Sequence, residues 1–151
     1  MKGVHITTAG EADIPELIEL LGVLFSIEQD FTPDPDKQRR GLAALLSSSA
    51  GHIAIARDPN ARAVGMATAQ LVISTAEGAP SAWIEDVVVR EDWRGQGLGR
   101  ALLDAVLAWA RSQGAVRAQL LADLDNAPAL AFYDKLDWQA TRLGARRLML
   151  D

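Results

Sequence analysis

Glycine and arginine are concentrated in one short segment of the sequence, "RGQGLGR". It holds Gly95, Gly97 and Gly99, interleaved with Gln96 and Leu98 and flanked by Arg94 and Arg100. A run of valines precedes it and a leucine-rich stretch follows, so we expect it to join a strand to a helix. The first N–H groups of a helix attract anions, and glycines allow close approach to them. The spacing therefore predicts a turn that binds phosphate.

Other interpretations of the same glycines remain open from spacing alone. The glycines could serve only a tight turn between strand and helix, although one glycine would suffice for that. A dinucleotide fingerprint needs a third glycine where this chain has Arg100, and a Walker loop needs Gly-Lys-Ser or Gly-Lys-Thr, which is missing. Both of these known phosphate loops therefore match poorly.

Two acidic residues, Glu85 and Asp86, interrupt the apolar run "WIEDVVV" just before the glycine segment. Carboxylates are uncommon in such runs, so at least one is expected to have a function, as a base or as a partner for a cation. The plainer alternatives are a solvated strand end for Glu85 and an arginine partner for Asp86. Strand alternation predicts opposite faces: Glu85 with Trp83, Val87 and Val89, and Asp86 with Ile84 and Val88.

The apolar periodicity predicts a mixed α/β layer with one sheet and a single domain over residues 1–151. The expected order is βααβββαβαβ. Helices are predicted at 11–25, 37–46, 97–113 and 127–136, and strands at 4–9, 51–58, 62–74, 82–90, 115–122 and 146–151. Gly114 is expected to end the third helix, and Asp125 or Asn126 to cap the fourth.

Composition limits the function classes. The chain has 151 residues, 49% of them hydrophobic and 23% charged, which is typical of a globular domain. It has no cysteine and two histidines, so we expect no metal site. A net charge of −5 argues against nucleic-acid binding. With no apolar stretch near ~20 residues and no signal-peptide core at the start, we expect no membrane segment and a cytoplasmic location.

Two motifs together resemble a known family. The stretch "EDVVVREDWRGQGLGRALL", with Arg94-x-x-Gly97-x-Gly99, is similar to the acetyl-CoA motif of the GCN5-related N-acetyltransferase (GNAT) superfamily. The downstream "NAPALAFYDKLDW" is similar to that family's Asn…Phe-Tyr…Leu-Gly-Phe segment, except that Asp137 stands where glycine is usual. The resemblance covers nearly the whole chain. It implies the GNAT fold, a mixed and mostly antiparallel sheet flanked by helices, with coenzyme A diphosphate on residues 94–100.

The same resemblance implies roles for particular residues. The strand is expected to bulge at Glu85 and to splay from its neighbour, so that the backbone along Val87, Val88 and Val89 binds the pantetheine arm. Glu85 is then the base that takes the amine proton, with Asp86 as the alternative. Tyr133 donates a proton to the leaving thiolate, although helical spacing alone also suits a core aromatic. Asn126 bonds the pantetheine arm and also caps its helix.

These implications define an acetyl-CoA-dependent N-acetyltransferase that acts by direct transfer, since no cysteine is available for an acetylated intermediate. The acidic segment "SIEQDFTPDPDK" between the first two helices suits a small cationic amine, but it is equally typical of a solvated loop. Phe25 and Phe31 are candidates for an apolar wall there. The alternatives are a protein lysine or N-terminal acetyltransferase, and a non-catalytic acyl-CoA-binding module. Relatives are often dimers, so a homodimer is also an expectation.

Overall fold

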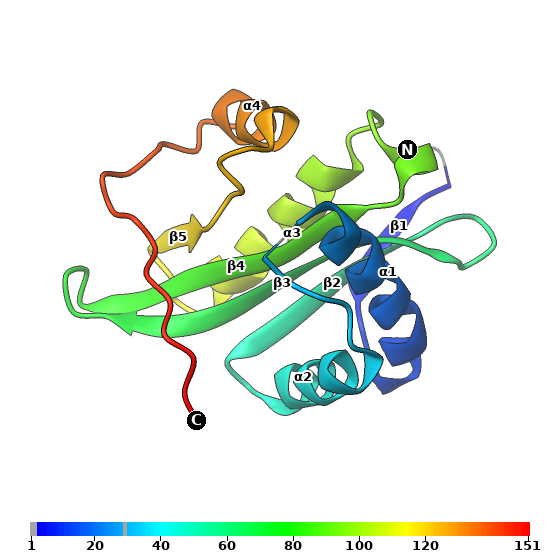
Figure 1. The fold of residues 1–151 in the computed structure, drawn as a ribbon, viewed down its shortest axis with the longest axis horizontal. Coiled ribbons are helices and arrows are strands. Elements are labelled where there is room, and N and C mark those ends of the chain that lie inside the picture. Colours follow the sequence, from blue (N-terminus) through cyan, green and yellow to red (C-terminus); the bar gives the residue numbers. More distant parts are fainter. Residues whose placement is uncertain (1–2, 29) are drawn as a thin grey trace. The chain divides into compact units, whose positions relative to one another are not determined.

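A computed structural model describes residues 3–28 and 30–151, which form two compact units, Met1–Leu120 and Leu121–Asp151. The first unit holds one five-stranded sheet of order β1-β2-β3-β4-β5 (Figure 1). Its strands are β1 (His5–Thr8), β2 (Gly51–Arg57), β3 (Ala63–Ser74), β4 (Ala79–Val89) and β5 (Arg117–Leu120). All neighbours are antiparallel except β4 and β5. The predicted mixed, mostly antiparallel sheet is confirmed.

Three helices belong to the first unit: α1 (Ile14–Ile27), α2 (Pro35–Ser47) and α3 (Leu98–Ser112). A short 3-10 turn, Glu11–Asp13, leads into α1. The Asp34 side chain caps α2 by accepting a hydrogen bond from Lys37 N at 3.2 Å, and Pro35 occupies the first turn, where proline is tolerated. The helix therefore begins two residues before its predicted start. Gly114, at a φ of 91°, follows the end of α3 as expected.

The helices cover both faces of the sheet (Figure 1). On one face, buried leucines of α1 pack with Leu42 of α2 and with Met66 and Val88 of the central strands. On the other face, α3 lies so close that a Cβ added at Gly65 would meet Leu102 Cδ1 at 2.9 Å. The side chains of α3 buried there are Leu98, Leu102, Leu103, Val106 and Ala110. Because the central strands are covered on both faces, β3 is buried continuously from Ala63 to Ala69.

Arginine and glutamate side chains fasten the sheet to α1. Arg90, just after β4, donates from Nε to the carbonyl oxygen of Ala63 at 2.8 Å and forms an ion pair with Glu19 at 3.0 Å. Ala63 N donates to Glu16 Oε2 at 2.8 Å. Asp13 pairs with Arg57, which lies opposite Ala63 at the same end of the sheet. The contacts of Arg90 and Glu16 hold the end of β4 and the start of β3 against α1.

The second unit contains one helix, α4 (Ala127–Lys135), and the chain beyond residue 138 is extended without strand pairing. The strand predicted at 146–151 is therefore wrong. A strand requires a hydrogen-bonding neighbour, and no second strand lies within Leu121–Asp151 to provide one. In the part of the chain that the structure covers, every helix falls short of the length and apolar character that a bilayer crossing requires.

Candidate active site at the β4 bulge

Strand β4 carries one extra residue where it runs beside β3. Thr68 lies opposite Glu85 and Met66 opposite Val88, so two steps along β3 correspond to three along β4. Asp86 takes up the difference with a φ of 54° in the left-handed region. Aspartate is among the few residues other than glycine that accept this conformation. The bulge that the family resemblance implies is confirmed, and its extra residue is one of the two acids.

The bulge changes which side chains share a face. Thr68 Oγ1 lies 3.0 Å from the carbonyl oxygen of Glu85 and 3.2 Å from Oδ2 of Asp86, so the Asp86 carboxylate reaches the face of Thr68. Glu85 is opposite Thr68 and shares that face. The prediction that the two acids point to opposite faces is therefore wrong, because strict alternation fails across an inserted residue.

The same insertion separates the residues that alternation had grouped with Asp86. Val88 lies opposite Met66 and packs in the core cluster with the α1 leucines, whereas Ile84 lies opposite Ala69, on the face that α3 covers. Both side chains are buried, but on opposite sides of the sheet. The bulge thus preserves an apolar core on each face while it brings two carboxylates to one of them.

The two acids differ in their surroundings. Burial, together with the negative charges of Glu85 and Glu28, raises the pKa of the Asp86 carboxyl to about 6, against the opposing effect of the Thr68 hydrogen bond. Glu85 is exposed, and its Oε1 accepts a hydrogen bond from Trp83 Nε1 at 2.9 Å. Asp86 is thus half-buried beside a hydroxyl, and Glu85 is solvated and held by an indole.

One edge of β4 changes character at the bulge. Strand β5 pairs in parallel with Ser81–Ile84, and the pairing stops at Ile84 opposite Leu120. For Glu85–Val89, the described part of the chain supplies no strand on that edge. Val87 and Val89 are half-buried there, while the side chain of Val88 is 5% exposed in the core. Any ligand contact at Val88 would therefore come from its main chain.

The glycine segment forms the turn into α3 that the sequence predicts. Gly95 and Gly97 have φ values of 77° and 84°, and Gly97 is the N-cap of the helix. Among residues 3–28 and 30–151, no protein group accepts a hydrogen bond from the backbone N–H groups of residues 95–100. A Cβ added at either glycine would meet no atom within 4 Å. The turn is an open set of donors at the positive end of a 15-residue helix.

The two arginines of this turn have different partners. Arg94 Nε donates to the carbonyl oxygen of Val89 at 3.0 Å, so two residues expected to bind the cofactor bind each other. Arg100 lies 3.8 Å from Asp104 in an exposed ion pair one turn along α3. Gln96 is exposed, and Leu98 is buried beneath the turn. The turn thus combines a buried leucine beneath it with two cationic side chains at its rim.

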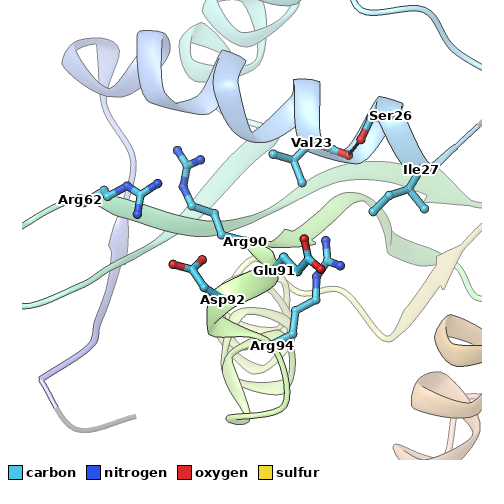
Figure 2. A pocket seen from close by; sticks show the side chains of 8 residues that line it. All are labelled: Val23, Ser26, Ile27, Arg62, Arg90, Glu91, Asp92 and Arg94. Atoms are coloured by element: carbon cyan, nitrogen blue, oxygen red, sulfur yellow. Dashed lines mark hydrogen bonds between the residues drawn. The ribbon is translucent and has the colours of Figure 1, made fainter.

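A pocket of about 350 Å³ lies next to this turn (Figure 2). Its lining residues are Val23, Ser26 and Ile27 of α1, Arg62 before β3, and Arg90, Glu91, Asp92 and Arg94 after β4. It shares Arg94 with the glycine segment but is not lined by Glu85 or Asp86. Sequence reasoning missed Arg62 and Arg90, because nothing in the local pattern marks these two residues as neighbours of Arg94.

The acidic segment after α1 has mixed roles. Glu28 acts electrostatically on Asp86, whereas Asp34 caps α2 and Asp36 pairs with Arg39 at 3.2 Å. Phe25 and Phe31 contact each other with ring centroids 5.5 Å apart. Gln29 of this segment lies outside the described residues. Two of its acids therefore support local structure, and Glu28 contributes to the field at the bulge.

The second unit holds the remaining predicted residues, Asn126 and Tyr133. Asn126 caps α4 by accepting a hydrogen bond from Ala129 N at 3.1 Å, as predicted. Asp137 ends the helix at a φ of 67°, and Trp138 N donates to the carbonyl oxygen of Tyr133 at 3.0 Å. Tyr133 also packs edge-on against Phe132 and Trp138. Aspartate thus replaces the usual glycine without loss of the helix exit.

The first unit therefore combines an acid-bearing bulge, an open strand edge and a helix N-terminus whose N–H groups have no partner in the described part of the chain. The family model described as "Acetyltransferase (GNAT) family" matches residues 15–138. The chain belongs to this family, and the resemblance seen in the two sequence motifs is confirmed.

Individual relatives agree with this membership. The chain is 31% identical over 146 residues to a glucosamine 6-phosphate N-acetyltransferase of Trypanosoma brucei brucei, covering 93% of this chain and 90% of the relative. It is 34% identical over 85 residues to an aminoglycoside N(6')-acetyltransferase type 1 of Stenotrophomonas maltophilia, covering 54% of this chain and 56% of that protein. The crystal structure of a Trypanosoma brucei acetyltransferase superposes with a TM-score of 0.73 at 27% identity, covering 98% and 99% of the two chains.

Proposed function

We propose that this protein transfers the acetyl group of acetyl-CoA directly to a primary amine of a small cationic molecule. The observation that carries the proposal is the sequence of features along β4. Two acids stand on a bulge, a strand edge without a β5 partner follows, and an open glycine turn begins the next helix. These features can place a thioester, an amine and a base in one site.

The glycine turn has the properties that coenzyme A requires. The unbonded N–H groups of residues 95–100 and the helix dipole suit the diphosphate, with Arg94 and Arg100 as added cations. Side chains at Gly95 and Gly97 would project into the open space over these donors. The main chain from Val87 to Val89 would hold the pantetheine arm in the manner of an added strand, together with Asn126. When bound, acetyl-CoA supplies an activated acetyl group and a thiolate leaving group.

The amine must lose a proton as it reacts. An alkylamine with a pKa near 10.4 is only about 0.1% neutral near pH 7.4, so a base within reach accelerates the attack. The carboxylates of Glu85 and Asp86 divide this work: one accepts the proton, and the other holds the cationic amine. The sequence favoured Glu85 as the base. Glu28 adds negative charge to the same face.

Tyr133 is the proposed proton donor to the sulfur that departs. The thiolate has a pKa of roughly 8.5 and leaves without full protonation, so the phenol assists but is not essential. The chain contains no cysteine, and direct attack by the amine is the route that its residues support.

The substrate class follows from charge and from the named relatives. One relative is named for glucosamine 6-phosphate and the other for aminoglycosides, and both substrates carry amines on a sugar ring. The acids Glu28, Glu85 and Asp86 favour the more cationic of these two classes. We therefore place an aminoglycoside-like amino sugar first, and a phosphorylated amino sugar second.

The test is a panel of amines with detection of free coenzyme A by a thiol reagent. Because the protein has no cysteine, it contributes no background signal. The panel holds an aminoglycoside, glucosamine 6-phosphate, spermidine and a lysine-containing peptide. We expect thiol release with a cationic amino sugar, and calorimetry should detect coenzyme A binding without any amine.

Each other result selects a different function. Turnover only with the peptide would make the protein a lysine or N-terminal acetyltransferase. Coenzyme A binding without turnover across the panel would support an acyl-CoA-binding module. Failure to bind coenzyme A at all would overturn the proposal.

A further inference from the structure

The hydroxyl of Thr68 is the buried polar group nearest to the proposed chemistry. Thr68 is 1% exposed in the middle of β3, within the apolar stretch "VGMATAQL". Its Oγ1 contacts two groups of the bulge, the Glu85 carbonyl oxygen at 3.0 Å and Asp86 Oδ2 at 3.2 Å. A buried hydroxyl that touches the main chain and the side chain of adjacent residues is suited to fix both.

The hydroxyl has one hydrogen and two acceptor lone pairs. When Asp86 is ionised, the stronger of the two possible bonds is donation to the carboxylate. When Asp86 is protonated, its own O–H can donate to Oγ1, and the threonine hydrogen is free to turn to the Glu85 carbonyl. Thr68 can therefore hydrogen-bond the Asp86 carboxyl group both before and after that group takes a proton. The two side chains then need little rearrangement during proton transfer.

The surroundings distinguish Asp86 from Glu85 as a proton acceptor. Asp86 is half-buried, its backbone is in the left-handed region, and Thr68 Oγ1 lies 3.2 Å from its carboxyl group. Glu85 is exposed and accepts from the indole of Trp83. The charged groups that act on Asp86 are Glu85, from the same strand, and Glu28, from the end of α1. Both are negative, which suits Glu85 and Glu28 to hold an ammonium ion nearby.

We propose, on the basis of the acetyl transfer proposed above, that Asp86 accepts the amine proton and that Thr68 is its positioning residue. In this step the nitrogen lone pair forms the bond to the acetyl carbon, and the N–H proton passes to Asp86 Oδ. The C–S bond breaks with its electron pair on sulfur, and coenzyme A leaves as the thiolate. Glu85 is left with the role of binding the cationic amine.

The experiment compares Thr68→Val, which removes the hydroxyl at nearly constant volume, with Thr68→Ser, which keeps it. Ser81→Ala is the matched control, since Ser81 is a buried hydroxyl of β4 that bonds a backbone carbonyl, that of Arg117, at 3.3 Å. For each protein, kcat/KM is measured from pH 5 to 9, coenzyme A binding by calorimetry, and the Asp86 carboxyl titration by ¹³C NMR.

We expect Thr68→Val to lower kcat roughly tenfold and to move the acid limb of kcat/KM up by about one pH unit, because the ionised carboxylate loses its donor. The NMR titration of Asp86 should move in the same direction, while coenzyme A binding stays unchanged. In Thr68→Ser and Ser81→Ala, the acid limb of kcat/KM should stay at the wild-type pH. Asp86→Asn leaves Thr68 intact and tests the inference even if Thr68→Val does not fold. Its kcat/KM should no longer fall at acid pH, and most turnover should be lost.

Two results would overturn the inference while acetyl transfer stands: a pH profile of Thr68→Val that superimposes on the wild type, or full activity in Asp86→Asn. Absence of transfer by the wild-type protein across the amine panel would instead remove the proposed function, and this inference with it.

Discussion

Trp83 and Glu85 stand two residues apart on β4, and the indole Nε1 of Trp83 donates to Oε1 of Glu85 at 2.9 Å. The indole holds the exposed Glu85 carboxylate beside Asp86. The negative charge of Glu85 adds to the effect of burial in raising the pKa of Asp86. The hydrogen bond between Trp83 and Glu85 therefore influences the pKa of Asp86.

Glu85→Gln tests this relationship. Removal of the negative charge should lower the pKa of Asp86, so the acid limb of kcat/KM should move to lower pH. The KM of a cationic amine should rise, because one carboxylate that attracts it is lost. Steady-state kinetics from pH 5 to 9 measures both effects. Glu77→Gln, a surface change in the β3–β4 turn, is the control, and a limb that moves upward in Glu85→Gln would contradict the prediction.

Asp86→Asn should make the protein more stable at neutral pH while it abolishes most turnover. The carboxyl pKa is raised from 3.8 to about 6 in the folded chain. Between these values the unfolded state ionises first, so the free energy of unfolding falls as pH rises from about 4 to 6 and stays low above that. A shift of roughly two units corresponds to about 3 kcal/mol at most.

Asparagine removes this penalty, tolerates the left-handed backbone and still accepts from Thr68. Urea unfolding at pH 4.5 and 7.5 should show a gain for Asp86→Asn only at the higher pH, and kcat should fall by on the order of 100-fold or more. A variant less stable than wild type at pH 7.5 would show that the ionised carboxylate stabilises the bulge.

Gly97→Ala should weaken coenzyme A binding. An alanine at a φ of 84° is strained by about 1 to 2 kcal/mol, and its methyl group enters the open space over the helix donors. Gly78→Ala is the matched control, since Gly78 has a φ of 66° and equally open surroundings in the β3–β4 turn. Thermal unfolding should show similar losses for both, while calorimetry should show a loss of about tenfold or more in affinity for Gly97→Ala alone.

His52→Phe should flatten the dependence of stability on pH near neutrality. His52 stacks on Trp109 with centroids 4.9 Å apart, and burial lowers the pKa of the imidazole below 6.5. As pH falls through 6.5 the unfolded chain binds a proton first, so the wild type loses stability toward acid pH. Phenylalanine keeps the stacking and removes this contribution. Denaturant unfolding at pH 5 and 8 measures the difference, with the exposed His5→Gln as control, and an unchanged slope would contradict it.

The sequence was sufficient for most of the fold because the periodic segments are long and clearly bounded. The leucines of α3 recur at helical spacing, and Gly114 marks its end. The last predicted strand, 146–151, has the right residue types but depends on a neighbour that local sequence does not specify. Strand existence is a property of two segments, whereas a helix satisfies its own hydrogen bonds.

For the candidate site, the sequence predicted the glycine turn but not the geometry of the two acids. The spacing of Gly95 and Gly97 identified the turn, since few other arrangements need two left-handed glycines beside arginines. The shared face of Glu85 and Asp86 was not predictable by alternation, because one inserted residue reverses every position after it. Thr68 was missed although a lone hydroxyl among alanines in β3 is a signal that a buried polar partner exists.

The left-handed backbone at position 86 acts as a filter on mutation. Few residues besides glycine, asparagine and aspartate adopt a φ of 54° without strain, so most other substitutions there should lower the free energy of unfolding by about 1 to 2 kcal/mol, apart from any loss of activity. Aspartate at position 86 thus meets two separate requirements, the left-handed backbone conformation and the proposed role of its carboxyl group. Only asparagine and glycine substitutions would separate the two demands, and conservation of the residue type alone would overstate its chemical importance.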